Sequence, residues 1–122
     1  MPTILIIEDD PVLNKTLSEE FAAAGFTTLS APDGEAGLAL ATEKNVDLII
    51  LDILMPKLDG IEFVYHLKQT LTRKIPIIVL TNLDTVALPE GIDHVLLKAN
   101  TDPETIIRLA KEKLSPGPSP SA

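Results

Sequence analysis

The sequence predicts an α/β fold, a doubly wound parallel sheet of five strands with helices on both faces. Short continuous runs of Ile, Leu and Val recur along the chain, as is typical of strands that are buried on both faces. Segments with apolar residues at helical spacing lie between these runs, and such alternation produces parallel strands joined by right-handed crossovers. With the strand order 2-1-3-4-5, the order reverses between the first and third strands, where open sheets of this kind bind ligands.

Five segments have the composition expected of the strands, at residues 3–7, 26–31, 46–51, 77–80 and 94–97. The third is the clearest, because an unbroken apolar run ends at Asp52, and Pro56 and Gly60 then turn the chain away. Taken alone, Asp52 is as consistent with a residue that caps a turn as with a functional carboxylate. The rest of the chain has to decide between these two interpretations.

Start and stop signals mark the helices. Asp10 before Pro11 is a favourable N-cap and first helical position, and Gly25 is suited to end that helix, expected at about residues 11–24. An Ala-rich helix is expected at 35–44, after an Asp33-Gly34 turn. Two later helices are expected to bury apolar faces made by Ile61, Val64, Leu67 and Leu71, and by Ile106, Ile107, Ala110 and Leu114.

The interval between Thr81 and the last strand is unusually short for a helical crossover. Pro89 and Gly91 interrupt a mixture of polar and apolar residues there. A helix in this interval has one or two turns at most, so we expect it to be short or partly absent.

Composition excludes several classes of protein. The 122 residues suit one domain, and a net charge of −8 opposes direct nucleic-acid binding, which needs a basic face. The absence of cysteine excludes a disulfide framework and a thiolate metal site. The first residues lack the pattern of a signal peptide, and no apolar stretch is long enough for a bilayer, so we expect a cytoplasmic protein without membrane contact.

Polar residues follow four different predicted strands. Glu8 and Asp9 follow the first, Asp52 the third, Thr81 the fourth and Lys98 the fifth. Three carboxylates brought together repel one another, and a divalent cation relieves this repulsion. Magnesium suits such a site because it binds a few carboxylate oxygens and leaves positions for phosphate oxygens. A carboxylate beside such an ion can act as the nucleophile toward a phosphoryl group.

Each of these residues also has a purely structural interpretation. Glu8 and Asp9 are acids of the kind favoured at the start of a helix. Thr81 alone is typical of a helix cap, and Lys98 alone of a solvated surface charge. Complementary groups at four separate strand ends rarely coincide by accident, so together they favour a functional site.

The sequence resembles the receiver domain of bacterial two-component response regulators over residues 3 to about 114. The resemblance rests on Ile-Leu-Ile-Ile-Glu-Asp-Asp, on Asp-Leu-Ile-Ile-Leu-Asp-Ile-Leu-Met-Pro-Lys-Leu-Asp-Gly, and on the strand-end threonine and lysine. It implies a flavodoxin-like fold, with a receiver domain at 1–114 and a flexible Pro/Ser-rich tail or linker at 115–122.

The resemblance also implies a role for each site residue. Asp52 corresponds to the phosphoacceptor, and Glu8 and Asp9, with Asp52 and the backbone carbonyl of Leu54, to the Mg²⁺ ligands. Thr81 corresponds to the switch hydroxyl and Lys98 to the cation that pairs with the phosphoryl group. Such domains take the phosphoryl group from a phosphohistidine and lose it by hydrolysis, so we expect no enzyme acting on external substrates. The expected partners are a sensor histidine kinase or phosphotransfer protein, a downstream protein or an output domain, and, as an open alternative, a second copy in a homodimer.

Some positions depart from the family pattern. Ala99 follows Lys98 where the family usually has proline, and Val95 replaces an aromatic residue that normally moves behind the threonine. His94 is adjacent but points to the opposite face of a strand, which favours a surface histidine over a substitute for that aromatic residue. Asn82 replaces a small residue, and either narrows access to Asp52 or caps the short helix.

Three other functions are weighed against a phosphorylation-dependent switch. A phosphorylation-independent pseudo-receiver, acting as an interaction module, is favoured by Val95, Ala99 and the short helix after Thr81, and is opposed by the intact acid cluster. A haloacid-dehalogenase-like phosphatase usually has a second aspartate two residues after its nucleophile, where this chain has Leu54. A flavin-binding domain is disfavoured because the first strand ends in acids rather than in a phosphate-binding loop.

Overall fold

The computed structural model describes residues 2–52, 60–70, 74–81, 92, 94–97 and 101–114. These residues form a parallel sheet of five strands in the order β2-β1-β3-β4-β5, as predicted. Along the chain the elements are β1 Thr3–Ile7, α1 Pro11–Ala23, β2 Thr27–Ala31, α2 Gly34–Glu43, β3 Leu48–Asp52, α3 Gly60–Thr70, β4 Ile77–Thr81, β5 His94–Leu97 and α4 Pro103–Leu114.

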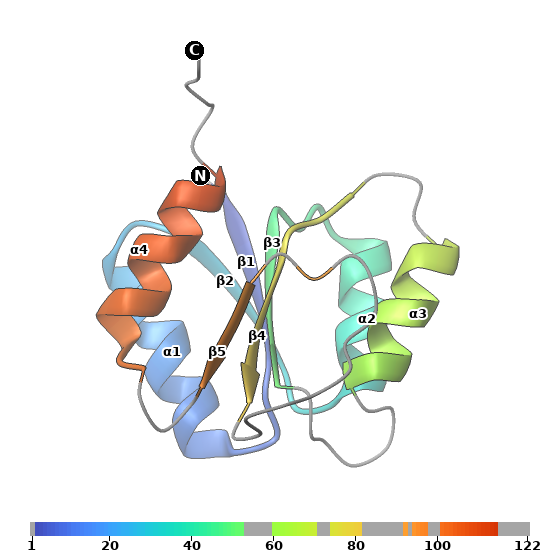
Figure 1. Cartoon of the computed structure of the whole chain (residues 1–122), viewed down its shortest axis with the longest axis horizontal. Helices are drawn as coiled ribbons and strands as arrows, with labels where there is room; N and C mark the ends of the chain where they lie inside the picture. Colours follow the sequence, from blue (N-terminus) through green and yellow to red (C-terminus); the bar gives the residue numbers. More distant parts are fainter. Residues whose placement is uncertain are drawn as a thin grey trace.

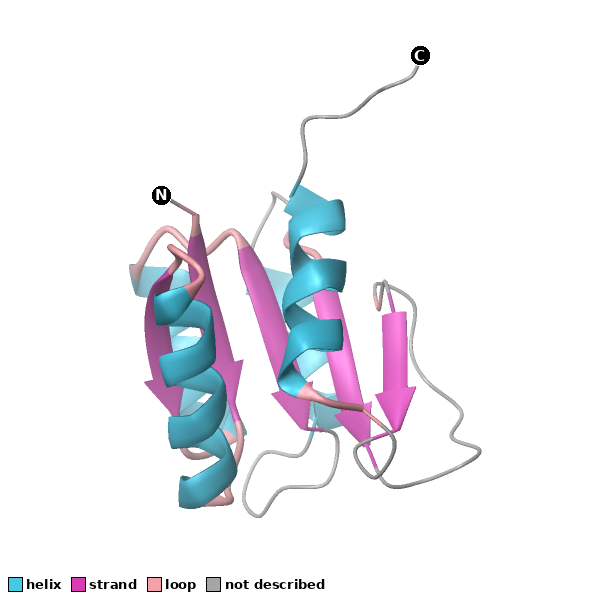
Figure 2. Cartoon of the chain, turned by 90° about the vertical axis from the view of Figure 1, so that its left-hand side faces the viewer, coloured by secondary structure: helices cyan, strands magenta, loops and turns pink. Residues whose placement is uncertain are grey.

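The helices form one layer on each side of the sheet. Helices α1 and α4 cover one face and α2 and α3 cover the other (Figure 1). All five strands point the same way, so their carboxyl ends share one edge (Figure 2). This edge carries the predicted site.

The central strands are apolar on both sides because each side faces a helix layer. In β1, Ile4 and Ile6 pack in the core beneath α1 and α4, whereas Leu5 and Ile7 pack in the core beneath α2 and α3. Every residue of β3 and β4 is buried, including the polar end residues Asp52 and Thr81. This double burial explains why the strands appear as continuous apolar runs in the sequence.

Helix α1 begins and ends where the capping residues predict. The side chain of Asp10 accepts hydrogen bonds from the N–H groups of Val12 and Leu13, and Pro11 is the first helical residue. At the other end Gly25 has φ 99°. The N–H of Phe26 then donates to Phe21 O at 3.1 Å, and the two rings pack edge to face at 5.5 Å. This Schellman-type ending uses Phe26, so β2 starts at Thr27 rather than at residue 26.

Other boundaries differ from the expected ones by one or two residues. Strand β3 runs from Leu48 to Asp52 rather than over 46–51. Asp47, just before this strand, is hydrogen-bonded to the start of β1 at the opposite edge of the sheet. Its carboxylate accepts from Thr3 N at 2.7 Å, and its own N–H donates to Thr3 O. Helix α2 starts at Gly34 because Asp33 is its N-cap and accepts from Ala36 N at 2.9 Å.

The apolar faces of the two later helices agree in part with the expected ones. In α3 the buried residues include Val64 and Leu67, as predicted, but also Phe63, which is fully buried. In α4, Ile106 and Ala110 are buried, whereas Ile107 and Leu114 pack only partly buried against the same core. The expected short helix between Thr81 and β5, with Asn82, lies outside the described residues, as do Leu71, Ala99 and the 115–122 tail.

Candidate functional site

The two acidic strand ends lie level with each other at the carboxyl edge. Ile7 and Leu51 are Cα partners in the β1–β3 ladder, and Glu8 and Asp52 are each the next residue along. Level residues of neighbouring parallel strands point to the same face, so Glu8 and Asp52 lie side by side. Both are buried, with 2% and 5% of their surfaces exposed.

Asp9 completes a cluster with these two residues. One carboxylate oxygen from each of Glu8, Asp9 and Asp52 lies within 4.8 Å of the other two. Asp9 is exposed, so the cluster has a buried base and a solvent-facing side. The sequence-based prediction that the acids of the first and third strands converge is therefore confirmed.

The third acid of the Glu8-Asp9-Asp10 run has a different task. Asp10 is directed to the first turn of α1, where it accepts from Val12 N at 3.0 Å. Its own N–H donates to Glu8 Oε2 at 3.1 Å. Consecutive acids are thus divided between the cluster and the helix cap.

The other predicted site residues are placed only in part. Thr81 is the last residue of β4 and is 1% exposed. It lies one position beyond Leu80, the Cα partner of Asp52, on the strand next to β3. Lys98 and Leu54 lie outside the described residues, so their roles remain predictions.

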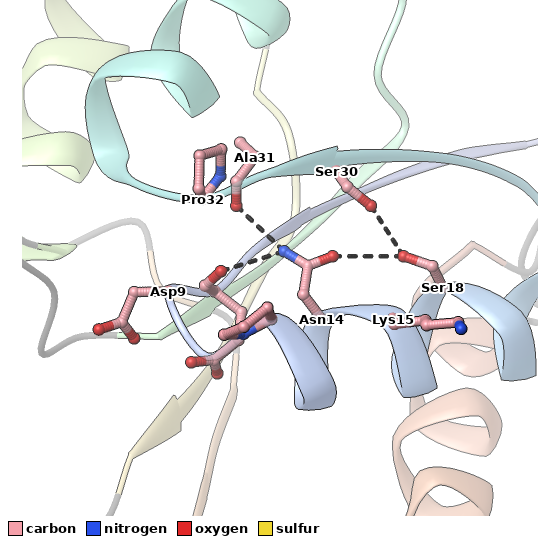
Figure 3. A pocket seen from close by; sticks show the side chains of 9 residues that line it. Asp9, Asn14, Lys15, Ser18, Ser30, Ala31 and Pro32 are labelled. Carbon is pink, nitrogen blue, oxygen red and sulfur yellow. Dashed lines mark hydrogen bonds between the residues drawn. The ribbon is translucent and has the colours of Figure 1, made fainter.

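Sequence reasoning missed Asn14, whose side chain is hydrogen-bonded to the backbone of the acid run. This residue of α1 is 9% exposed, and its Nδ2 donates to the backbone oxygens of Glu8 and Ala31, each at 3.1 Å (Figure 3). A groove of about 470 Å³ runs beside it, lined by residues of α1 and of the ends of β1 and β2. An asparagine in a helix carries no local signal of this role, since both acceptors lie outside the helix.

The donor set of the cluster fits a hard divalent cation. It offers only carboxylate oxygens, the ligands that Mg²⁺ and Ca²⁺ prefer over nitrogen or sulfur. Three like charges so close together also repel one another, and a bound cation offsets that repulsion. The residues present therefore suit a magnesium ion.

Comparison with known proteins identifies the family. Residues 4–111 match the family model of the response regulator receiver domain. The chain belongs to this family. Its relatives include the transcriptional regulatory protein CpxR of Klebsiella pneumoniae, 40% identical over 114 residues, and the DNA-binding regulator RpaA of Synechocystis, 36% identical over 115 residues. Each alignment covers 89% of this chain and 48% of the relative, so the chain spans about half the length of these curated relatives.

Solved receiver domains have the same fold. The receiver domain of the Francisella response regulator 1452 aligns with a TM-score of 0.84 at 28% identity, covering 93% of this chain and 97% of that one. The Thermotoga maritima response regulator TrrA, solved in complex with Mg²⁺ and BeF, aligns with a TM-score of 0.78 at 28% identity, covering 91% and 98%. The flavodoxin-like receiver fold and the family resemblance are thereby confirmed.

Family membership gives the cluster its general context. Receiver domains bind Mg²⁺ at an acidic pocket and act in phosphorylation-dependent two-component signalling, in which histidine kinases or phosphotransfer proteins are their partners.

None of the helices in the described part of this receiver domain has the length and apolar content needed to span a membrane. On β5, His94 is exposed and Val95 is 42% exposed, so the histidine lies at the surface as expected.

Proposed function

We propose that this receiver domain is a phosphorylation-dependent switch in which Asp52 accepts the phosphoryl group. The observation that supports this proposal most strongly is the position of Asp52, buried at the end of β3 with carboxylate oxygens of Glu8 and Asp9 within 4.8 Å. A buried aspartate among like charges is costly for stability, and such a cost is typical of a functional site.

In the proposed reaction, a carboxylate oxygen of Asp52 attacks the phosphorus of a phosphohistidine on a sensor kinase or phosphotransfer protein. The new O–P bond forms as the N–P bond breaks, and the electron pair returns to the histidine nitrogen. Glu8, Asp9, Asp52 and the Leu54 carbonyl would hold Mg²⁺, which when bound offsets the charge of the carboxylates and of the phosphoryl oxygens. Lys98 pairs with one phosphoryl oxygen, and water later hydrolyses the aspartyl phosphate.

Thr81 is the proposed link between the chemistry and the output. Its hydroxyl would donate to a phosphoryl oxygen on Asp52, which favours one of two conformations that already interconvert. The support is its place at the end of β4, next to the strand that carries Asp52. The reaction is confined to this chain's own aspartate, so the domain is a regulator rather than an enzyme acting on external substrates.

The proposed partners follow from the family and from the length of its members. The relatives are named as transcriptional regulators and are about twice as long as this chain, so an output domain or a separate downstream protein would read the switch. Residues 1–114 would be the receiver unit and 115–122 a flexible tail or linker. A net charge of −8 favours protein partners over direct nucleic-acid contact. Cytoplasmic localisation is proposed from the family, whose members are typically cytoplasmic. A homodimer is a further proposed assembly, and the molecular mass of the protein in solution tests it.

The test is intact-mass analysis after incubation with acetyl phosphate, with and without Mg²⁺. We expect the mass of one phosphoryl group to be added to the wild type only with Mg²⁺, and Asp52→Asn to add none. Asp47→Asn is the matched control, because this exposed aspartate precedes the same strand at the opposite edge and its amide oxygen still accepts from Thr3 N. If Asp52→Asn were phosphorylated as fully as the wild type, and on the same residue as the wild type, Asp52 would not be the acceptor and the proposal would be contradicted.

A constitutive pseudo-receiver is the second candidate, because exposed Val95 stands where the family usually has an aromatic residue. Beryllofluoride, which mimics the phosphoryl group on an aspartate, separates the two. Binding without stable phosphorylation indicates restricted donor access or fast hydrolysis. Failure of both phosphorylation and beryllofluoride binding would favour the pseudo-receiver.

A further inference from the structure

Asn14 connects the backbone that carries the acids to the first helix. Its Nδ2 donates to the carbonyl oxygens of Glu8 and Ala31, each at 3.1 Å, and Ala31 O also accepts from the N–H of Glu8 at 3.1 Å. Glu8 is therefore held on both sides, by β2 at its N–H and by Asn14 at its carbonyl. Because both oxygens can only accept, the nitrogen of the amide must face them.

The same residue closes a ring of contacts around the acid loop. The N–H of Asn14 donates to Asp10 O at 2.9 Å, and the N–H of Asp10 donates to Glu8 Oε2 at 3.1 Å. From Asn14 the ring returns to Glu8 through the side-chain amide. Asp9 is the residue between Glu8 and Asp10 in this ring, and the carbonyl oxygens of both neighbours accept hydrogen bonds from Asn14.

The geometry of the peptide bond transmits this restraint to the metal ligands. The peptide unit between Glu8 and Asp9 is planar, so fixing the Glu8 carbonyl also fixes the direction of the Asp9 N–Cα bond. The amide of Asn14 is held in turn by Ser18, whose hydroxyl lies 3.4 Å from Asn14 Oδ1 and 2.8 Å from Ser30 Oγ (Figure 3). A chain of contacts thus runs from β2 through α1 to the acids.

We propose that Asn14 is a positioning residue for the metal centre: it holds the Glu8–Asp9 peptide so that both carboxylates converge with Asp52. This inference rests on the proposed function, since it assigns a role toward the cation that the acids would hold. Asn14 itself contacts neither the cation nor the phosphoryl group. Groups that orient metal ligands from behind typically change metal affinity by about 10–100-fold when removed.

The test is a Mg²⁺ titration of the full chain followed by the amide NMR shifts of Asp9 and Asp10, which also report that each variant is folded. Asn14→Leu keeps the branching and the number of side-chain heavy atoms but removes both donors, and we expect its Mg²⁺ dissociation constant to rise about 10-fold. In acetyl phosphate reactions, the Mg²⁺ concentration for half-maximal rate should rise similarly, while the rate at saturating Mg²⁺ stays unchanged. A purely structural role would not divide the effects in this way.

Two matched controls on the same helix separate positioning from stability. Leu17→Val shortens a buried side chain of α1 that makes none of these hydrogen bonds, and Thr16→Val removes a hydroxyl of the same helix that donates to Val12 O, outside this chain of contacts. Both should keep the wild-type Mg²⁺ affinity. If Asn14→Leu does not fold, Asn14→Ser, whose shorter side chain can make at most one of the two hydrogen bonds, should fold and bind Mg²⁺ more weakly than the wild type.

The outcomes distinguish this inference from the proposed function. A wild type that binds no Mg²⁺ and accepts no phosphoryl group would overturn both. A functional wild type, with folded Asn14→Leu or Asn14→Ser at wild-type Mg²⁺ affinity, would overturn the positioning role alone. Loss of affinity in Leu17→Val equal to that in Asn14→Leu would likewise reduce Asn14 to a stability role.

Discussion

Gly37 of α2 lies so close to Ile7 of β1 that a Cβ atom on Gly37 would be 2.5 Å from Ile7 Cδ1 and 2.8 Å from Ile7 Cγ1. Both residues are buried, so neither atom can move into solvent. The close approach, and not a special backbone angle, requires glycine here. The contact also bears on the acid cluster, because Ile7 is the last residue of β1 and immediately precedes Glu8.

We therefore expect Gly37→Ala to destabilise the protein. Alanine favours a helix by about 1 kcal/mol over glycine, but forcing an extra methyl group into a packed core costs about 1–3 kcal/mol. The free energy of unfolding from urea titration should fall despite the better helix former. A variant more stable than the wild type would show that α2 can move away from β1 without cost.

A second substitution checks the cause. Ile7→Val removes Cδ1, the atom nearest to the added Cβ. In a double-mutant cycle, Gly37→Ala should cost less in the Ile7→Val background, with a coupling of about 0.5 kcal/mol or more. Additive effects would mean that the two residues do not clash.

The acid cluster predicts an unusual gain of stability when its charge is reduced. Without Mg²⁺, Asp52→Asn should raise the free energy of unfolding by about 1 kcal/mol, because it removes a buried charge from among like charges. Added Mg²⁺ should stabilise the wild type as its concentration rises and should stabilise the variant much less. Urea titrations in chelator and in Mg²⁺ measure both effects.

Asp47→Asn controls for the loss of one negative charge from the whole chain. Asp47 is exposed and lies at the opposite edge of the sheet, so its replacement should leave the response to Mg²⁺ unchanged. If Asp52→Asn were destabilising in chelator, other interactions of Asp52 would outweigh the repulsion among the acids.

The hydrogen bonds of Asp102 at the start of α4 predict a pH-dependent contribution to the free energy of unfolding. Hydrogen bonds from the Thr105 hydroxyl and N–H, each 2.8 Å from Asp102 Oδ1, hold the pKa of this carboxyl below its ordinary value of 3.8. A pKa lowered in the folded state gives stability that is present above the unfolded pKa and is lost as pH falls through the folded pKa. The loss should therefore occur below pH 3.8.

Thr105→Val tests the cause of that shift because it removes the hydroxyl and keeps the branched shape. The pKa of Asp102, followed by NMR titration, should rise toward its ordinary value in the variant. The variant should also lose less stability on acidification than the wild type. An identical pKa in the two proteins would exclude the hydroxyl as the principal cause.

Local chemistry explains why much of the fold could be predicted. Strands buried on both faces must be apolar throughout, and the caps at Asp10 and Gly25 satisfy needs of the adjacent backbone. The convergence of Glu8 and Asp52 follows in the same way, because parallel strands bring their carboxyl ends to one edge. These features depend on short stretches of sequence and on sheet topology.

Contacts between distant segments could not be predicted. Asn14 donates a hydrogen bond to Ala31 O across 17 residues. Its spacing from Leu17 and Phe21 places it on the buried face of α1, but this spacing does not indicate which backbone oxygens it binds. Phe63 is buried beside Val64, although the helical pattern predicted a face made by Ile61, Val64, Leu67 and Leu71 and did not include Phe63. The close approach of Gly37 and Ile7 is likewise a property of how a helix docks on a strand.

The Glu8-Asp9-Asp10 run gives the sharpest prediction about the metal centre, because the structure assigns different tasks to two adjacent aspartates. Asp9 contributes an oxygen to the cluster with Glu8 and Asp52, whereas Asp10 is directed to the N–H groups of α1. Asp9→Asn should weaken Mg²⁺ binding about 10-fold or more, since it removes a charged ligand. Asp10→Asn should keep both Mg²⁺ affinity and stability, since asparagine caps helices as well as aspartate does.

The two variants change the same charge one residue apart, so each serves as the control for the other in a Mg²⁺ titration. If the cation were held only by the summed charge of this segment, removing either charge would weaken binding to a similar extent, because the two aspartates are adjacent in the chain. Direct ligation by Asp9 requires a much larger loss in Asp9→Asn. An equal loss would show that the cluster attracts the cation through its summed charge, and a larger loss in Asp10→Asn would mean that the cap, by holding the loop, contributes more to the site than the ligand beside it.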